Sequence, residues 1–318
     1  EEEQGELFDS GRVESGETFL LLSNLKLRSR GRYFWRVRAW DTFGNEAISE
    51  DAFWEMGLLD ESEWQAEWIE PEQPRQFVTA QLVKDFRVYE ELPDTSNCVP
   101  CHLLRREFCV TKPVRRARAY ATAHGLYRLE LNGRRVGDLE LTPEPTSYDK
   151  YLQYQTYDVT TLLTGADTLT FTVAGGWAVG SFVFTRKNRV TADRQALLAE
   201  LRIEYTDGTT ETIGTDATWQ VSESGPVRMA DLYDGETYDA TQEISDWHNA
   251  APETLKVTPA ITADYGAPVK AHEVRKPVAV MTAPDGETIY DFGQNLAGVV
   301  RIKFNGKAGQ VVTVRHAE

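Results

Sequence analysis

Segments in which apolar and polar residues alternate with a period of two constrain the fold of this chain more than any other feature. The clearest begins at Tyr127 and reads "YRLELNGRRVG". Tyr127, Leu129 and Leu131 share one face of a predicted strand, and the charged residues between them share the other. The Asn132-Gly133 pair that follows favours the two positive φ angles of a type I′ turn. This segment therefore predicts a β-hairpin with a two-residue turn.

The same alternation recurs along most of the chain. It predicts strands at residues 33–40, 53–54, 77–88, 104–110, 115–123, 168–175, 197–205 and 211–215. Asp207-Gly208 marks a second tight hairpin, and Asn305-Gly306 marks another in the final segment. No long stretch has the 3.6-residue period of an amphipathic helix. The sequence therefore predicts an all-β protein with very few helical residues.

Composition limits the classes of partner. The chain has 50 Asp plus Glu against 34 Lys plus Arg, and its net charge of -16 repels a phosphate backbone. We therefore expect no nucleic-acid partner. No apolar run approaches the ~18 residues that a membrane-spanning helix needs, so we expect no membrane partner either. Neutral ligands such as sugars are unaffected by this charge.

The three cysteines are too few for a disulfide framework. Cys98 and Cys101 form a Cys-x-x-Cys pair, with His102 beside it and Cys109 nearby. One such pair does not complete the four ligands of a structural zinc site. No thioredoxin-like βαβ pattern flanks it either. We therefore interpret this segment as a loop with incidental cysteines.

Several motifs, taken in order, resemble those of one enzyme family. "YFWRVRAWDTFGNEA" and "EWQAEWIE" are similar to a fibronectin-like module and its exit, and "HGLYRLELNGRRVGD", "LQYQTYDVT" and "DLYDGETYDA" are similar to a jelly-roll domain. "YDFGQNLAGVVRIKFNGKAGQVVTVRHAE" resembles the opening of a further β-domain. This order is similar to that of the N-terminal region of bacterial α-L-rhamnosidases, and the similarity covers most of the chain.

The resemblance implies a division of the chain into four parts. We expect a truncated fibronectin type III-like domain at 1–57, a linker at 58–74, a jelly-roll (galactose-binding-like) sandwich at 75–268 and the truncated start of a further β-sandwich at 269–318. The leucines before Tyr33 fit the first assignment, because they resemble the approach to the tyrosine corner of such sandwiches. The linker contains a short helical piece and is closed by Pro71 and Pro74.

The resemblance also implies the activity of a parent enzyme, which hydrolyses terminal α-L-rhamnose from glycosides or polysaccharides by inversion. Inversion needs a general acid and a general base about 6.5–9.5 Å apart. In the family, this pair lies in an α/α barrel that follows the β-domains. Glu1 and Glu318 both interrupt patterned sequence, so we interpret the chain as a fragment without that barrel and assign it no catalytic residue. We expect the fragment to supply scaffold and carbohydrate binding.

Candidate sugar contacts gather in two stretches of the predicted jelly-roll. Trp177 lies at the end of a predicted strand, and Tyr148 and Asp149 lie in "SYDKYLQYQ". The alternative role of such aromatic residues is to fill the core of the sandwich. Sugar-binding versions of this module hold calcium partly through an Asp-Asn pair, and the corresponding residues here are Asp149 and Lys150. A lysine beside the ion competes with the metal, so we expect any sugar binding to be independent of calcium.

Four carboxylates gather in "DLYDGETYDA", which spans residues 231–240. Calcium favours grouped oxygen ligands, so Asp234, Glu236 and Asp239 form a candidate calcium site. Glu236 and Asp239 are also a candidate acid/base pair. The alternative is a turn at Asp234-Gly235 whose carboxylates accept hydrogen bonds from backbone amides. No phosphate-binding loop or dinucleotide fingerprint is present, so no other cofactor is expected.

Three other functions remain open. One is an independent carbohydrate-binding module. A second is the jelly-roll portion of a β-galactosidase-type glycoside hydrolase, which shares "DVT" and the following "LL" but less clearly "YDFGQN". An adhesion protein built from sandwiches explains the strand at 33–40 but not the ordered motifs downstream. No signal-peptide pattern is visible, and the cytoplasm is favoured over secretion.

Overall fold

The computed structural model describes residues 7–70, 101–180, 192, 194–232, 235–252, 259–307 and 309–316. Their regular structure consists of strands, apart from one four-residue α-helix and two short 3-10 helices, which confirms the all-β prediction. None of the described helices has the length and apolarity to cross a membrane. The chain divides into two compact units, residues 1–137 with 141–265, and residues 138–140 with 266–318. The strand predicted at 77–88, Cys98 and Asp234 lie outside the described residues.

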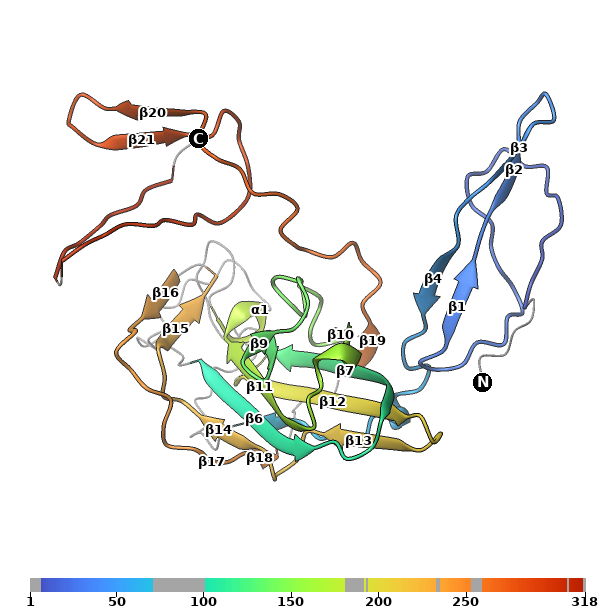
Figure 1. Cartoon of the computed structure of the whole chain (residues 1–318), viewed down its shortest axis with the longest axis horizontal. Helices are drawn as coiled ribbons and strands as arrows, with labels where there is room; N and C mark the ends of the chain where they lie inside the picture. Colours follow the sequence, from blue (N-terminus) through green and yellow to red (C-terminus); the bar gives the residue numbers. More distant parts are fainter. Residues whose placement is uncertain are drawn as a thin grey trace, which may run out of the picture. The chain divides into compact units, whose positions relative to one another are not determined.

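Residues 7–57, here called the first module, contain two small ribbons (Figure 1). β1 (Arg32–Trp35) pairs with β4 (Ala52–Glu55), and β2 (Arg38–Trp40) pairs with β3 (Glu46–Ile48). Tyr33 is buried, and its ring stacks on that of Trp54 with centroids 5.4 Å apart. Its Oη accepts a hydrogen bond from the Arg28 backbone N–H at 2.7 Å. This bond to the chain just upstream is the geometry of a tyrosine corner, as the sequence predicted.

The strand predicted over residues 33–40 is divided in the structure. β1 pairs with β4 and β2 pairs with β3, so the chain changes partner between Trp35 and Arg38. At the change, the Val37 N–H donates to the side-chain Oγ of Ser49 at 3.0 Å instead of to a strand carbonyl. The prediction of one continuous strand is therefore wrong here.

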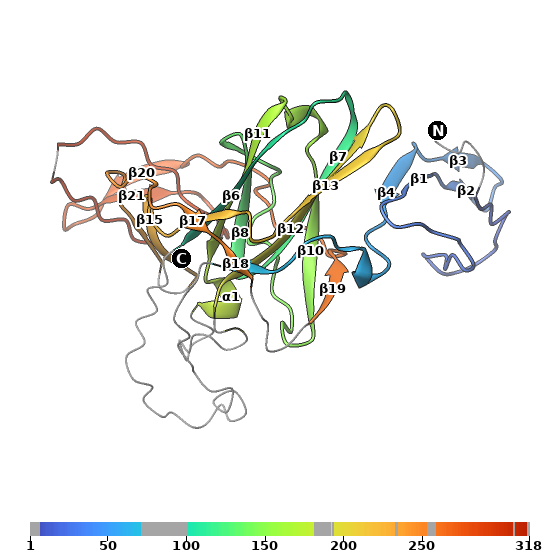
Figure 2. The ribbon, with the colours of Figure 1, turned by 90° about the horizontal axis from the view of Figure 1, so that it is seen from below.

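Most of the remainder of the first unit is a sandwich of two sheets, which Figure 2 shows as two layers. One sheet has the order β18 (Ala251–Pro252), β5 (Ile69–Glu70), β12 (Ala196–Tyr205), β7 (Val114–His124), β10 (Tyr151–Asp158) and β19 (Ala260–Ala263), with β13 (Thr210–Gly214) paired to β12. The other has the order β17 (His248–Asn249), β14 (Gln220–Ser222), β6 (His102–Cys109), β11 (Ala166–Ala174), β8 (Leu126–Leu131) and β9 (Arg134–Arg135). The strands predicted from residue 104 to residue 215 are all present within a few residues.

The core of the sandwich lies between the two sheets. Leu201 of β12 faces Phe171 of β11 and the fully buried Trp219. Because side chains alternate along a strand, Glu200 points to the opposite, outer face of the seven-stranded sheet. Glu200 is nevertheless only 2% exposed. The outer face must therefore be covered by another part of the chain.

The hairpin predicted at Asn132-Gly133 is confirmed. Leu131 of β8 stands opposite Arg134 of β9, which leaves Asn132 and Gly133 as the two turn residues. Their φ angles are 54° and 70°, the positive values of a type I′ turn. A Cβ on Gly133 would meet no atom within 4 Å. The backbone conformation alone therefore favours glycine at this position.

Replacing Gly133 with valine is expected to lower the free energy of unfolding by about 1 kcal/mol or more, because a β-branched residue is strained at positive φ. Urea unfolding of the two proteins measures the difference. Gly16→Val is a suitable control, since Gly16 also has open space around it but no positive φ. An unchanged midpoint for Gly133→Val would contradict the assigned turn.

The described part of the predicted linker, residues 58–70, is built into the sandwich. Its helical piece is confirmed as the 3-10 turn η1 (Glu61–Glu63), which begins with a capping box. The Asp60 carboxylate accepts a hydrogen bond from the Ser62 N–H, and the Glu63 carboxylate accepts one from the Asp60 N–H. A few residues later, β5 pairs with β12 and joins the seven-stranded sheet. β5 is a strand that the sequence pattern did not reveal.

The second unit contains one described hairpin, β20 (Ala279–Thr282) paired with β21 (Thr288–Asp291). The hairpin predicted at Asn305-Gly306 is wrong, because neither residue has a positive φ and the described residues from 292 onwards form no strand. Val299 and Val311 are 100% and 84% exposed. Alternation alone does not make a strand where the apolar side chains have no layer to pack against among the described residues.

Candidate functional site

Trp177 lies on the one described α-helix, α1 (Gly176–Val179), which follows β11. Gly176 has a φ of 54°, and a Cβ there would come within 2.8 Å of the Leu126 backbone nitrogen. A larger residue would be strained and would displace this neighbour. The glycine thus permits the tight connection from β11 and fixes where the partly buried Trp177 stands.

The structure brings Tyr148 and Trp177 into one apolar cluster. Its buried members are Tyr148, Leu152, Ala178 and Val179, against which Trp68, Trp177 and Ala192 pack while partly exposed. The Tyr148 Oη donates a hydrogen bond to the Glu144 carbonyl at 2.7 Å. Burial, and then the nearby Glu144 carboxylate, raise the pKa of Tyr148. Tyr148 is only 4% exposed, so its ring supports the cluster from within, and Trp177 presents the more accessible ring.

Asp149 lies on the turn next to Tyr148 and is exposed. The turn is closed by the Lys150 N–H, which donates to the Ser147 carbonyl at 2.7 Å. Lys150 is exposed as well. The Asp149 carboxylate and the Lys150 ammonium group are therefore both available to solvent at this turn.

Sequence reasoning missed Trp68, Glu70 and Arg194. Trp68 packs against the cluster, and its ring lies 4.8 Å from that of the buried His124. Glu70 forms an ion pair with Arg194 at 2.5 Å, and both side chains are at most 8% exposed. Their partners lie far along the chain, and no local motif marks them. The apolar Trp68-Ile69 pair is the one local feature from which β5 could have been predicted.

The carboxylates at residues 231–240 lie on and after a two-stranded ribbon, β15 (Val227–Asp231) with β16 (Gly235–Tyr238). Glu236 is exposed on β16. Asp239 accepts hydrogen bonds from the Thr241 N–H at Oδ1 and from the Gln242 amide at Oδ2, each at 3.0 Å. The bonds from Thr241, and then that from Gln242, hold the pKa of Asp239 below its ordinary value. Asp239 is thus engaged in its own turn, and Asp234 lies outside the described residues.

Other reactive groups do not gather into a site in the described part of the chain. There, no three His, Cys, Asp or Glu side chains are grouped as a metal ion would require. Cys101 is buried and Cys109 is exposed, and both are free thiols. Burial, and secondarily Glu236, raise the pKa of Cys101 to about 11. Its thiol is therefore protonated and unreactive at neutral pH.

The residues of the Trp177 cluster are suited to binding a ligand and not to transferring a proton. An indole ring offers a flat apolar face with a polar N–H at its edge, and the exposed Asp149 carboxylate is an acceptor for hydroxyl groups. Proton transfer to a substrate would need a positioned acid and base in a cleft. Glu236 is exposed on a ribbon and Asp239 is engaged in its turn, so neither has the setting of such a group.

Three family models match the chain in order. Residues 1–60 match the Rha78A-like N-terminal immunoglobulin domain, residues 112–289 match the alpha-L-rhamnosidase N-terminal domain, and residues 281–318 match the bacterial alpha-L-rhamnosidase concanavalin-like domain. Among curated proteins, the chain is 33% identical to an alpha-L-rhamnosidase of Alteromonas sp. (strain LOR), over 98% of this chain and 34% of that protein. It is 43% identical to one of Streptomyces avermitilis, over 68% of this chain and 22% of that protein.

Solved structures agree with these matches. The chain resembles the Streptomyces avermitilis alpha-L-rhamnosidase complexed with L-rhamnose at a TM-score of 0.73 and 25% identity, covering 92% of this chain and 44% of that one. It resembles the alpha-L-rhamnosidase from Dictyoglumus thermophilum at a TM-score of 0.73 and 29% identity, covering 92% and 32%. The chain thus spans about a third of the length of the Alteromonas relative that it matches almost from end to end.

Proposed function

The chain belongs to the α-L-rhamnosidase family, and from that membership we propose that it is the N-terminal, non-catalytic part of an enzyme that removes terminal α-L-rhamnose from glycosides or polysaccharides by inversion. The observation that carries the proposal is the order of the three matched domains, which extends from residue 1 to residue 318. The partner of the parent enzyme is then a rhamnose-containing carbohydrate. Within that enzyme, the described residues supply scaffold and a carbohydrate contact.

On its own, this chain is expected not to hydrolyse an aryl α-L-rhamnoside. Inverting hydrolysis needs two carboxylic residues aligned on opposite sides of the sugar, and Glu236 and Asp239 lack that setting. Release of the aryl group by purified protein measures the activity. Turnover that is abolished by Glu236→Gln, but not by the control Glu243→Gln at another exposed position, would show that the active site lies in this chain.

The second candidate role is weak binding of L-rhamnose near Asp149 and Trp177. Two observations favour this role. The ring of Trp177 is partly exposed where it packs against the Tyr148 cluster, and the carboxylate of Asp149, next to Tyr148, is exposed. A neutral monosaccharide at an exposed site makes few contacts. We therefore expect a dissociation constant in the millimolar range, or about 4 kcal/mol of binding free energy.

Titration with L-rhamnose followed by NMR tests this role. The expected result is a saturable shift at millimolar sugar that persists with a chelator, because Lys150 disfavours a bound calcium ion at this turn. Trp177→Ala should abolish the shift, whereas Trp35→Ala on the first module should leave it unchanged. Tight binding that requires calcium would refute the argument from Lys150, and a flat titration would leave the module as scaffold.

A further inference from the structure

The outer face of the seven-stranded sheet carries charged side chains that are withdrawn from solvent. Glu200 of β12 has a fully buried side chain, and the Arg118 side chain of the neighbouring β7 is 6% exposed. Both point away from the core between the sheets, because their strand neighbours Leu201 and Ala119 line it. A buried charge is costly unless it is paired and hydrogen-bonded. The partners of these two charges therefore show what covers the face.

Glu200 is neutralised by the first module and the segment that follows it. The Arg30 guanidinium contacts Glu200 Oε1 through Nη2 at 2.8 Å, and the Gln65 backbone N–H donates to Glu200 Oε2 at 2.8 Å. Arg30 also pairs with Glu63 at 3.1 Å, and its guanidinium lies over the Tyr120 ring of β7, 5.5 Å from the centroid. Arg30 thus joins the first module, the linker and the sheet at one point.

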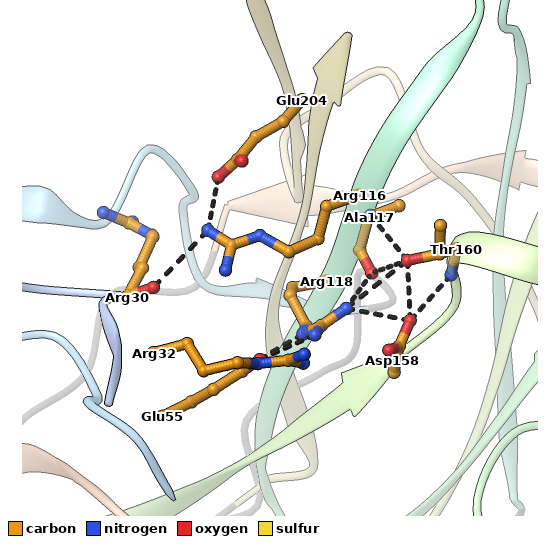
Figure 3. A network of polar contacts seen from close by, with 9 residues as sticks. All are labelled: Arg30, Arg32, Glu55, Arg116, Ala117, Arg118, Asp158, Thr160 and Glu204. Carbon is orange, nitrogen blue, oxygen red and sulfur yellow. Dashed lines mark hydrogen bonds and ion pairs between the residues drawn. The ribbon is translucent and has the colours of Figure 1, made fainter. Parts of the chain in front are cut away.

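A second ionic contact joins the first module to β7 (Figure 3). Arg118 donates to both oxygens of Glu55, from Nε at 2.9 Å and from Nη2 at 2.6 Å, in a bidentate geometry that fixes direction as well as distance. Arg32 donates to the same carboxylate from the first module, and Asp158 of β10 contacts the far side of Arg118 at 2.8 Å. Burial opposes ionisation of Glu55, but the two arginines outweigh it and lower its pKa to about 2.

On β10, the strand next to β7, residues that follow the first module cover the same face of the sheet. The Tyr154 Oη of β10 accepts a hydrogen bond from the Leu58 N–H at 2.6 Å, and its ring meets that of Trp64 edge-on, with centroids 5.3 Å apart. A Cβ on Gly57 would come within 2.4 Å of that same Oη. Only a glycine lets the backbone approach the sheet this closely. The exit from the first module is therefore fitted to the sheet and does not hang free.

We propose that the first module is docked as a fixed part of the sandwich. Arg30 and Glu55 are its two ionic anchors, and residues 57–66 pack against the sheet instead of forming a flexible hinge. Two separate anchors, on β12 and on β7, oppose rotation about either one. Removing one partner of a buried pair leaves the other charge uncompensated, which is the costly case. The first module would then hold a constant orientation on the enzyme, and the sandwich would depend on it for stability.

The proposal is tested in the full chain with Arg30→Met and Glu200→Met, singly and together. Arg30→Met, which leaves Glu200 buried without a cation, is expected to raise the unfolding equilibrium constant about 100-fold or more. Glu200→Met should raise it less, because Arg30 keeps its pair with Glu63. Both variants are expected to open residues 57–66 to chymotrypsin at Leu58 and Trp64. The double variant, which removes both charges, should lose less than the sum of the two. Arg38→Met is the matched control, because Arg38 pairs with Glu46 at 3.8 Å with both side chains about half exposed.

Glu55→Gln provides the same comparison at the other anchor if an Arg30 variant does not fold, since it removes the charge and keeps the shape. Cleavage at residues 57–66 in Glu55→Gln but not in Arg38→Met would support the docked arrangement. Resistance to chymotrypsin equal to that of the control in all folded variants, or strictly additive losses in the double variant, would overturn it.

Discussion

Replacing Trp219 with alanine is expected to lower the free energy of unfolding by about 3–5 kcal/mol, because it leaves a large cavity between the two sheets. The indole is fully buried, its ring lies 6.0 Å from that of Phe171, and its Nε1–H donates to the Gly214 carbonyl at 2.8 Å. The two sheets pack against each other at this side chain. Neighbouring residues cannot fill the cavity that the indole would leave unless whole strands move. The loss also removes the hydrogen bond to the carbonyl of the partly buried Gly214.

Urea unfolding of Trp219→Ala, monitored by far-UV circular dichroism, measures this loss of stability. Trp35→Ala is the matched control, since Trp35 is 46% exposed on the first module, and it should cost about 1 kcal/mol or less. Trp219→Phe should fall between the two, because it refills most of the cavity but loses the hydrogen bond. Equal losses for Trp219→Ala and Trp35→Ala would mean that Trp219 does not hold the sheets together.

The strands of the sandwich could be predicted because their signal is local. β12 was predicted at 197–205 and spans Ala196–Tyr205, and β11 was predicted at 168–175 and spans Ala166–Ala174. Each faces the core on one side only, so alternation is visible along the strand itself. The same signal failed at Asn305-Gly306, where the pattern is present but the described residues supply no neighbouring strand. Hydrophobic periodicity indicates that a segment can form a strand, but not that a neighbouring strand is present for it to pair with.

The contacts that cover the outer sheet could not be predicted, because they join residues far apart in the chain. Glu200 sits in the charged half of an alternating strand, where a solvated side chain is the ordinary expectation, yet Arg30 and Gln65 bury it. The candidate sugar-binding residues have a similar limit. The sequence did not show whether the rings of Tyr148 and Trp177 face the core or the solvent. In the structure, Tyr148 is buried and Trp177 is partly exposed. The direction in which such a side chain points is set by tertiary packing, and the pattern of a single strand carries no information on that packing.

Asn132 shows how a residue identified for one reason acts in a second way. Sequence reasoning selected it for its positive φ in the turn. In the structure, its side chain also accepts a hydrogen bond from the Thr168 N–H at 2.9 Å and donates to Asp167 Oδ1 at 2.7 Å. The hairpin is thereby tied to the start of β11, the strand beside β8. Asp167 is the centre of this connection.

Replacing Asp167 with alanine is expected to lower the free energy of unfolding by about 3 kcal/mol. The carboxylate is buried, and besides Asn132 it accepts hydrogen bonds from the Thr164 N–H at 2.8 Å, the Thr164 hydroxyl at 2.9 Å and the Gly165 N–H at 3.0 Å. Hydrogen bonds to a charged group contribute more than neutral ones, and buried donors left without an acceptor each carry a further cost. Urea unfolding at neutral pH measures the loss, and Asp207→Ala is its control.

Asp207 makes the same kind of local turn, accepting a hydrogen bond from the Thr209 N–H at 2.9 Å. Asp207 is exposed, so its hydrogen-bond donors return to water when it is replaced, and the loss of stability should be much smaller.

The pH dependence of stability gives a second, independent check on Asp167. Burial alone would raise the pKa of Asp167, but the hydrogen bonds from Asn132 and the turn outweigh it and hold the pKa below its ordinary value. A carboxyl group whose pKa is depressed in the folded state stabilises the protein at neutral pH, and it loses this contribution as the pH falls from about 5 towards 2. The stability difference between wild type and Asp167→Ala should therefore shrink over that range. A difference that stayed constant down to pH 2 would mean that the carboxylate charge is not what holds the hairpin to β11.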